Sequence, residues 1–479
     1  MKTKLTRWTA LLLCSLMMLG AFAACGQPST PATPNEESSS GGGKVKEELI
    51  IAMSGDAKSL DPMKCWQTTA YYTYWLMYER LFYKDPTTGE YKPELAKSWE
   101  IAEDGMSYTF YLQEGVTWHD GSPLTAKDVK YTVERGLELG TGNYPGVAGV
   151  EIIDDHTVKI VMSAPDSVFM DKQWTGDCCI VKEGTDEELA QAPMGTGPFK
   201  FVEWVSGDHI TLEAYDGYWR EQCGTKKIIL RIMPEANARL LALQAGDVDI
   251  AMLDAANVAQ VTADTNRQML STTSNVVNYL GFNCSRPPFD NELVRAAIGY
   301  AIDKDAIVTA QLEGHGVTIR SYVGLGQNGY YDGFDHFTYD PAKAKELLAQ
   351  AGFANGFECS LAHNVSGGAL ATQLIQANLG EIGIKVKIEP MESAAFTEYM
   401  QNGNADMFFT SRGGGSADSY LMMLDKDSIG AEGNVFFYTN DEYDDMLTQS
   451  HLTTDDNARN EIYRKMQEHI NDHTPMVPL

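Results

Sequence analysis

The first 43 residues are not expected to be part of the folded protein, whose core must form from the residues that follow them. Basic residues precede an apolar run from Leu11 to Ala23, which only Cys14 and Ser15 interrupt. This pattern predicts a cleaved secretory signal over residues 1–24, because the run is too short to cross a bilayer. The stretch from Gln27 to Gly43 is rich in Ser, Pro, Thr, Gly and Glu. It cannot bury a core, so we expect a flexible tether.

The signal ends in Ala23-Ala24-Cys25-Gly26, with Phe22 before it. This ending is similar to the lipobox, which directs a diacylglyceryl group to a thiol, although the lipobox prefers Leu where Phe22 stands. The resemblance implies a lipid on Cys25, with residues 25–46 tethering the protein to the outer face of the cytoplasmic membrane or to the periplasmic side. The alternative is an ordinary signal followed by an unrelated Cys.

After the tether the chain keeps about 435 residues, enough for two or three core-forming units, and it contains no second apolar run of membrane-spanning length. The chain has 37 Lys and Arg against 66 Asp and Glu, a net charge of −29. Without the three basic residues of the signal the counts are 34 and 66, a net charge of −32. Such acidity excludes nucleic acid as the expected partner. It suits cationic or zwitterionic ligands, but a self-repelling soluble surface explains it equally simply.

Six cysteines remain beyond Cys14 and Cys25. Their spacing forms no CxxC pair, so neither a zinc ribbon nor a thioredoxin-type site is predicted, and no cofactor or metal is expected. Export permits disulfides, but most of these cysteines are expected to be small buried residues. They are Cys65, Cys178, Cys179, Cys223, Cys284 and Cys359.

Short alternating segments and capped helices together predict an α/β fold with more than one sheet. Asp340 before Pro341 predicts a helix start, and Thr125 with Asp128 predicts a capping box. Val294 opens an apolar helical stripe that runs to Ile302. A helix followed by a strand is predicted from Gln373–Leu379 into Ile384–Ile388. Three alternating segments predict strands, at Met106–Leu112, His156–Val161 and His209–Tyr215.

Several short sequence motifs follow one another in order between Leu60 and the end of the chain. They include Leu60-Asp-Pro62, Pro93-Glu-Leu-Ala-Lys-Ser-Trp99, Trp118-His-Asp-Gly121, Gly195-Thr-Gly-Pro198 and Leu243-Gln-Ala-Gly-Asp-Val-Asp249. Together they resemble the extracellular solute-binding proteins that serve peptide and nickel ABC importers. The resemblance covers about four-fifths of the chain, so it carries more weight than any single motif.

The resemblance implies a two-lobed fold with three domains and a ligand between the lobes. The first lobe is expected over residues 47–280, with an inserted subdomain at about 77–182, and the second over 281–470. Residues 471–479 are expected to start a return to the first lobe. The chain stops at Leu479, inside a Pro-x-x-Pro-Leu phrase that family members continue beyond. This predicts either a truncated product or a first lobe with an open sheet edge.

The implied function is that of a monomeric receptor of an ABC importer. It would capture a peptide or related small solute by hinge closure and pass it to permease subunits and their ATPases. The alternatives are a surface-anchored sensor or adhesin of the same fold without an importer, or a peptide-processing enzyme. The enzyme is disfavoured because GxSxG, HExxH and P-loop motifs are absent. Gly324 to Gly329 matches GxGxxG, but without a βαβ context it is interpreted as a loop.

The resemblance also implies where the ligand binds. In the family an extended peptide lies like an added strand, and its amine pairs with a carboxylate in a loop of the second lobe. The corresponding stretch runs from Thr410 to Tyr420, and Asp418 is the candidate carboxylate, with Ser411 and Gly414 beside it. Arg412 is expected either to hold a ligand carboxylate or phosphonate, or to pair with Asp418. Peptide binders usually have an aromatic residue and an acidic-Pro step here, which leaves peptide specificity open.

Other candidates come from the places where the family brings the lobes together. Cys65 and Trp66 follow the first of these motifs, Leu60-Asp-Pro62, and are predicted either to face the ligand or to pack inside a helix. Asn283 borders the crossing into the second lobe and is predicted to be a hinge or ligand contact. For nickel-type members, His119 and His363 stay open as contacts. The spacing of His469 and His473 suits two metal ligands, but a solvated polar helix face is the stronger expectation.

Overall fold

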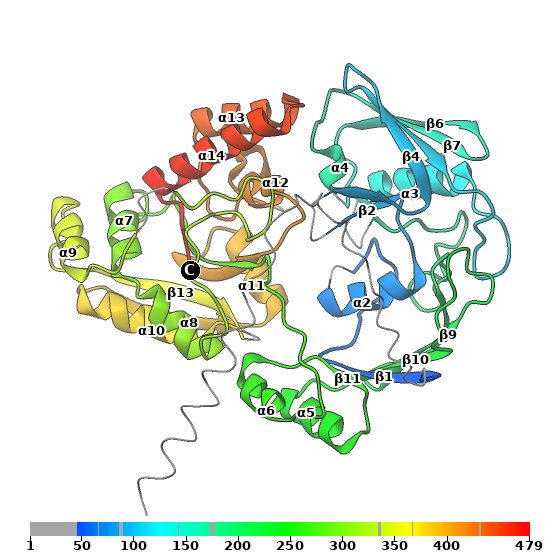
Figure 1. Cartoon of the computed structure of the whole chain (residues 1–479). Coiled ribbons are helices and arrows are strands. Elements are labelled where there is room, and N and C mark those ends of the chain that lie inside the picture. Colours follow the sequence, from blue (N-terminus) through cyan, green and yellow to red (C-terminus); the bar gives the residue numbers. More distant parts are fainter. Residues whose placement is uncertain are drawn as a thin grey trace, which may run out of the picture. The chain divides into compact units, whose positions relative to one another are not determined.

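The computed structural model of the protein describes residues 46–479, except 66, 86–89, 142, 173–177, 334–336, 366 and 431–432. The predicted signal, Cys25, the tether and Trp66 therefore lie outside the described residues. Within them, three larger sheets and a two-stranded ribbon are flanked by helices (Figure 1). The α/β fold class predicted from the sequence is confirmed.

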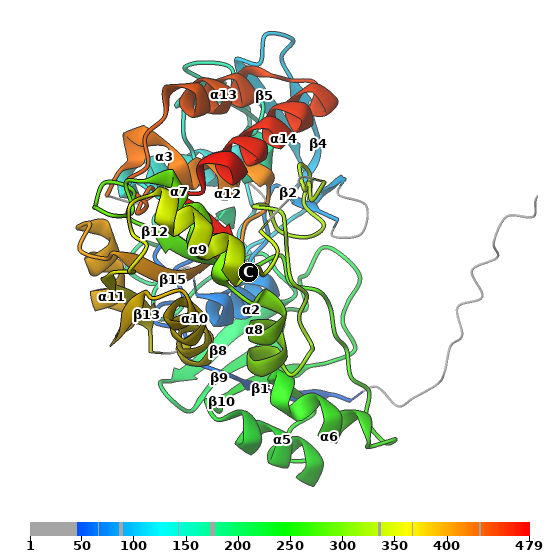
Figure 2. The same cartoon turned by 90° about the vertical axis from the view of Figure 1, so that its left-hand side faces the viewer.

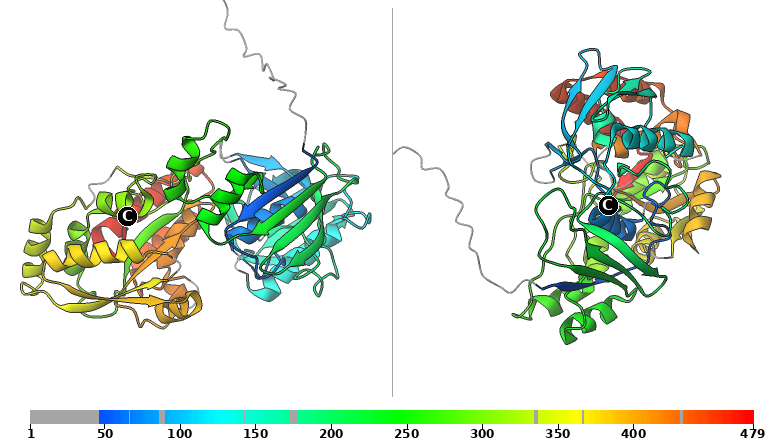
Figure 3. Two further views of the ribbon diagram at one scale, coloured as in Figure 1. Left: turned by 90° about the horizontal axis from the view of Figure 1, so that it is seen from below. Right: turned by 90° about the vertical axis from the view of Figure 1, so that its right-hand side faces the viewer.

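The first sheet has five strands in the order β11-β1-β10-β9-β8. Strand β1 runs parallel to both β10 and β11, while β9 runs antiparallel to β10; Figure 3 shows the blue strand β1 beside green strands of this sheet. Helix α2 adds Tyr74 and Met77 to one buried core, and Ala242 of α5 packs with Ala52 in another. The elements are β1 (Glu48–Met53), α2 (Thr68–Met77), β8 (Phe199–Val205), β9 (His209–Ala214), β10 (Lys227–Ile232), α5 (Ala236–Ala245), β11 (Ile250–Ala251) and α6 (Val258–Thr262).

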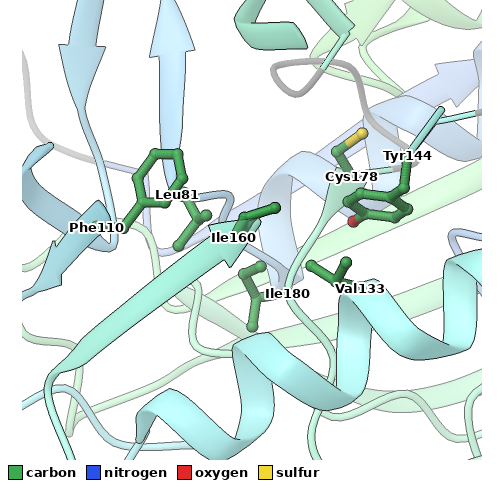
Figure 4. A pocket seen from close by; sticks show the side chains of 7 residues that line it. All are labelled: Leu81, Phe110, Val133, Tyr144, Ile160, Cys178 and Ile180. Carbon is green, nitrogen blue, oxygen red and sulfur yellow. The ribbon is translucent and has the colours of Figure 1, made fainter. Parts of the chain in front are cut away.

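A four-stranded antiparallel sheet, β4-β5-β7-β6, forms a second core with the ribbon β2-β3 and helices α3 and α4; we call this the four-stranded unit. Val133 of α3 and Ile160 of β7 help to line a small cavity in this core, whose lining contains no charged side chain (Figure 4). The cavity therefore belongs to the packing of the unit. Its elements are β2 (Phe82–Lys84), β3 (Tyr91–Pro93), β4 (Ala96–Ile101), β5 (Ser107–Leu112), α3 (Ala126–Leu139), β6 (Val147–Asp154), β7 (Thr157–Met162) and α4 (Phe169–Lys172).

The second five-stranded sheet, β14-β13-β15-β12-β16, is buried on both faces. Along β15, Met407 and Phe409 enter one core and Phe408 enters the other, because successive side chains of a strand point to opposite faces. Helices α13 and α14 pack against each other beside this sheet (Figure 2). The strands are β12 (Val277–Phe282), β13 (Glu358–Asn364), β14 (Lys385–Met391), β15 (Met407–Arg412) and β16 (Met476–Pro478).

Eight helices accompany the second sheet in the described part of the chain. They are α7 (Glu292–Ala301), α8 (Lys304–Leu312), α9 (Pro341–Gln350), α10 (Ala369–Glu381), α11 (Ser393–Gln401), α12 (Ala417–Leu421), α13 (Asp441–Leu452) and α14 (Asp456–His473).

Strand β16 lies at one edge of the second sheet. Residues 471–479 were expected to start a return to the first lobe, which stays a prediction, and within them β16 pairs antiparallel with β12. The reason is burial, since Met476 enters one core of this sheet while Val477 and Leu479 enter the other. The predicted lobe boundaries stay predictions, and β12 already belongs to the second sheet at Val277.

The local predictions are confirmed. Strands β5, β7 and β9 cover the three alternating segments, and α10 is followed by β14. The side chain of Thr125 accepts from the Lys127 amide, and Asp128 completes the capping box of α3. Asp340 caps α9 by accepting from the Lys343 amide at 2.9 Å. Four of the six cysteines are buried, Cys284 is half-buried and Cys223 is exposed. Among the described residues, no helix is both long and apolar enough to cross a membrane.

Candidate functional site

The loop between β15 and α12 is held against the chain that precedes β12. The Tyr420 hydroxyl donates to the Asn275 carbonyl at 2.5 Å, and the Asn275 side-chain amide donates to the Gly414 carbonyl at 2.7 Å. The Gly414 amide donates to the Tyr420 hydroxyl at 3.1 Å. A Cβ on Gly324 would lie 2.1 Å from the Asn275 carbonyl oxygen, so only glycine permits this approach. The predicted loop at Gly324 thus supports the candidate site.

Asp418 lies in the first turn of α12 and is 1% exposed. Its Oδ1 accepts a hydrogen bond from Nε2 of His451, in the last turn of α13, at 2.6 Å. The His451 side chain is 32% exposed. Burial raises the pKa of Tyr463 well above its usual range, and the negative charge of Asp418 adds to this shift. Asp418 is thus a buried carboxylate whose imidazole partner reaches solvent.

Arg412, the last residue of β15, donates from Nε to the Ser419 carbonyl at 3.0 Å. Burial lowers the pKa of its guanidinium, while the nearby hydroxyls of Tyr279 and Tyr420 act in the opposite direction. Of the two roles predicted for Arg412, pairing with Asp418 is not seen among the described residues: Nε of Arg412 bonds the Ser419 carbonyl, and Asp418 bonds the His451 imidazole. The guanidinium instead binds the carbonyl of Ser419, the residue that follows Asp418 in α12.

Ser411 and Gly414 take different places in the same loop. Ser411 is exposed on β15 opposite Asn278, so its hydroxyl faces away from the core. Gly414 is half-buried, and a Cβ there would lie 2.4 Å from the Ser419 side chain. The loop therefore needs glycine at 414 to fold back over α12.

The polar atoms of Asn283 and Cys65 already have partners within the protein. Asn283 is 1% exposed; its amide donates to the Gly403 carbonyl at 3.0 Å and its Oδ1 accepts from the Ser285 hydroxyl at 2.7 Å. Cys65 is buried in the core below α2, and its thiol lies 3.6 Å from Oε1 of Gln67. Both residues therefore have structural partners that explain their positions.

The histidines left open for nickel-type contacts bind the backbone. His119 lies 3.0 Å from the Gly197 carbonyl, and burial lowers the pKa of its imidazole to about 4. His363 Nδ1 lies 2.9 Å from the Asn364 carbonyl. His469 is buried and bonds the Tyr438 hydroxyl at 2.8 Å, which differs from the predicted solvated face. In the described part of the chain, no three His, Cys, Asp or Glu side chains are placed to hold a metal ion.

A residue of the four-stranded unit contacts the last turn of α13, which carries His451. Ser167 donates from its amide and from its hydroxyl to the His451 carbonyl, each at 2.9 Å, and its hydroxyl also lies 3.2 Å from the Ser450 carbonyl. These carbonyls belong to the last turn of α13, where a helix has no internal donors for them. In the sequence, His451 stands out only as the single basic residue in that turn, a position that the helix dipole alone explains.

Comparisons with known proteins agree on one family. The model described as bacterial extracellular solute-binding proteins, family 5 middle, matches residues 90–431. The heme-binding protein A of Haemophilus influenzae is 31% identical over 444 residues, which is 84% of this chain and 81% of that protein. The dipeptide-binding protein of Escherichia coli is 28% identical, covering 90% and 88%. The solved periplasmic binding protein DppA of Helicobacter pylori, in complex with the peptide STSA, gives a TM-score of 0.80 at 29% identity, covering 90% and 92%.

Proposed function

The chain belongs to the bacterial extracellular solute-binding proteins of family 5, and on that premise we propose that it captures a short peptide and delivers it to the permease subunits of an ABC importer. The family is one of solute-binding receptors rather than of enzymes. The proposed receptor acts as a monomer that closes on its ligand, and the permeases recognise the closed form before their ATPases drive import. A sensor or adhesin of the same fold, working without an importer, is the competing proposal.

The buried carboxylate of Asp418 is the observation that carries the peptide proposal. The carboxylate is 1% exposed and bonds the His451 imidazole, and the ammonium of a peptide would bring it a full charge and three donors. The names of two relatives, a dipeptide-binding protein and a binding protein with bound peptide, support the same ligand class. Heme-binding protein A is named for another ligand, but a heme brings no ammonium to such a carboxylate.

The remaining residues of the proposed site surround the same loop. Arg412 would offer its terminal nitrogens to a ligand carboxylate while Nε stays on the Ser419 carbonyl. Ser411 is exposed on β15 and would meet the peptide main chain. Trp66 stays in the proposal as a contact from the first lobe. Asn283 and Cys65 are left out because their polar atoms are bonded within the protein.

Calorimetric titration of the purified protein with di- and tetrapeptides tests the proposal. Asp418→Ala should weaken binding at least about tenfold, which corresponds to roughly 1.4 kcal/mol. Asp441→Ala is the matched control, because the Asp441 side chain on α13 is 97% exposed, and it should bind as the unchanged protein does. Equal affinity of the Asp418 variant would remove the assignment of the site. If no peptide bound the unchanged protein, the peptide proposal itself would fail.

We also propose that the receptor is anchored through a lipid on Cys25. The motif at residues 23–26 supports this, and tethering would raise the effective concentration of the receptor near its permease. Cys25→Ser should move the protein from the membrane fraction to the soluble fraction, with unchanged peptide affinity. Membrane association that survives the substitution and a carbonate wash would contradict the lipid anchor.

A further inference from the structure

Ser167 joins the four-stranded unit to helix α13 through both of its donors. Its amide and its hydroxyl each donate to the His451 carbonyl at 2.9 Å, and the hydroxyl also lies 3.2 Å from the Ser450 carbonyl. The last carbonyls of a helix have no donor of their own within it. Ser167 therefore caps the end of α13 from a position 284 residues before His451.

The loop that carries Ser167 is held in place by its own unit. The Tyr108 hydroxyl donates to the Asp166 carbonyl at 2.6 Å, and the Val168 amide donates to Oδ1 of Asp166 at 3.0 Å. The ring centroids of Tyr108 and Phe169, the first residue of α4, lie 4.7 Å apart within the core of the unit. Both neighbours of Ser167 are thus fixed, so its two donors are presented to α13.

Helix α14 also lies close to the four-stranded unit. Burial raises the pKa of Tyr108 on β5 to about 12, and the charge of Arg459 on α14 acts in the opposite direction. Burial raises the pKa of Tyr463 on α14 well above its usual range, and the charge of Asp171 on α4 adds to this shift. Such effects weaken with distance, so the two surfaces are neighbours beyond the Ser167 contact.

The Ser167 contact can be broken without opening a core. Among the residues that the structure describes, the core of the four-stranded unit and the core beside α13 and α14 have no member in common. Ser167 is half-buried, and the groups that it joins are polar. Water can replace such hydrogen bonds at little net cost in free energy. The contact is therefore suited to forming and breaking while each part stays folded.

His451 connects this contact to the proposed ligand site. Its carbonyl accepts from Ser167, and its Nε2 lies 2.6 Å from Oδ1 of Asp418 in α12. A movement of the four-stranded unit against α13 therefore acts on a residue that bonds the proposed ligand carboxylate.

We propose that Ser167 is a positioning residue for ligand capture: together with the carbonyls of Ser450 and His451 it forms a clasp that holds the receptor closed on a bound peptide. The inference rests on the capture by closure proposed above and deepens it, because it names a contact that retains the ligand. Bonds made only in the closed receptor stabilise that state relative to the open one. Since the ligand enters the open receptor, the clasp slows release more than it speeds capture.

Stopped-flow kinetics with the tetrapeptide Ser-Thr-Ser-Ala tests the clasp. Ser167→Ala removes the hydroxyl, so the dissociation rate should rise roughly threefold to tenfold while the association rate changes less than about twofold. Ser167→Thr keeps the hydroxyl and should release the peptide within about twofold of the unchanged protein. Ser163→Ala is the matched control and should release it unchanged, because Ser163 lies in the same loop but its hydroxyl donates at 2.9 Å to the Gly146 carbonyl.

Equal dissociation rates for Ser167→Ala and the unchanged protein would overturn the inference, as would a faster release that Ser167→Thr shares. A lowered midpoint of urea unfolding in Ser167→Ala with an unchanged dissociation rate would also overturn it, because Ser167 would then have a purely structural role.

The unchanged protein allows a test that needs no variant. Amide hydrogen exchange at Ser167, followed by NMR, should slow at least about fivefold when the tetrapeptide is bound, because the amide then stays on the His451 carbonyl. The Ser163 amide, which donates to the Gly146 carbonyl at 2.7 Å, is the internal control and should exchange at the same rate. Identical exchange at Ser167 with and without bound peptide would overturn the inference. Absence of any tetrapeptide binding would instead count against the proposed function, and the inference would fall with it.

Discussion

Asp61, below the first sheet, and Asp418, beside the second, are both buried carboxylates, yet they are held in different ways. Asp61 is 0% exposed, and Arg135 donates to its two oxygens at 3.1 and 2.6 Å. The Arg135 side chain is itself 5% exposed and always charged. Asp418 accepts a hydrogen bond from the His451 imidazole, whose side chain is 32% exposed. A permanently charged, buried partner marks Asp61 as a structural carboxylate, whereas the imidazole that bonds Asp418 reaches solvent.

The largest expected effect comes from breaking the Asp61 pair. Arg135→Met leaves Asp61 charged and buried beside Lys64, whose amine is 3.7 Å away and 52% exposed. We expect the free energy of unfolding to fall by about 3 to 5 kcal/mol, measured by urea unfolding at neutral pH. Combining it with Asp61→Asn should restore part of the loss. Lys97→Met, which breaks an exposed pair with Glu114, is the control and should change stability by less than about 1 kcal/mol.

Equal unfolding midpoints for Arg135→Met and the unchanged protein would contradict this view of Asp61. The two hydrogen bonds from Arg135 would then no longer explain why Asp61 has a structural role that Asp418 lacks.

Glu79 extends the comparison to a buried carboxylate with mainly neutral partners. It is 3% exposed, it accepts from the Trp219 indole at 2.9 Å and the Tyr218 hydroxyl at 3.2 Å, and Arg220 lies 3.9 Å away. Burial raises the pKa of Glu79 to about 7. The folded protein therefore holds this proton more tightly than the unfolded chain does. The stability that Glu79 contributes is fully present below about pH 4.5 and is lost as the pH rises to about 7.

The second prediction follows from this window. Glu79→Gln should remove a decline in unfolding free energy between about pH 4.5 and 7 that amounts to at most about 3 kcal/mol. Urea unfolding at several pH values measures it, and Glu114→Gln, at a 75% exposed side chain, should leave the decline unchanged. A decline that is the same in Glu79→Gln and in the unchanged protein would show that neutral donors suffice to keep Glu79 ionised.

The sequence predicted those features of the fold that depend on near neighbours. Thr125 and Asp128 are three residues apart, and Asp340 immediately precedes its helix, so caps and helix starts are visible in the sequence itself. Alternation along β5 is equally local. The pairing of β16 with β12 was not predicted, because the two strands lie about 200 residues apart and no local pattern identifies such a partner.

In the candidate site, too, contacts between residues far apart in the sequence were not predicted. Asp418 was found through family resemblance, but its partner His451 lies 33 residues further along, on another helix. Ser167, which fixes the His451 backbone, is 284 residues away in the four-stranded unit. The two roles open for Arg412 were chemically reasonable, and only the folded loop shows that its Nε turns to the Ser419 carbonyl. Packing, rather than residue type, decides which donor reaches which acceptor.

The order of strands in the first sheet also determines how early β1 can pair with both of its neighbours. Strand β1 is flanked by β10 and β11, so residues 48–53 cannot acquire their neighbours before residue 251 has been made. At about 5 to 20 residues per second, translation takes roughly 10 to 40 seconds to cover that distance. Pairing between such distant segments also slows folding once the chain is complete. For a member of an extracellular family, this delay means that β1 stays without its sheet neighbours while the first half of the chain is being made.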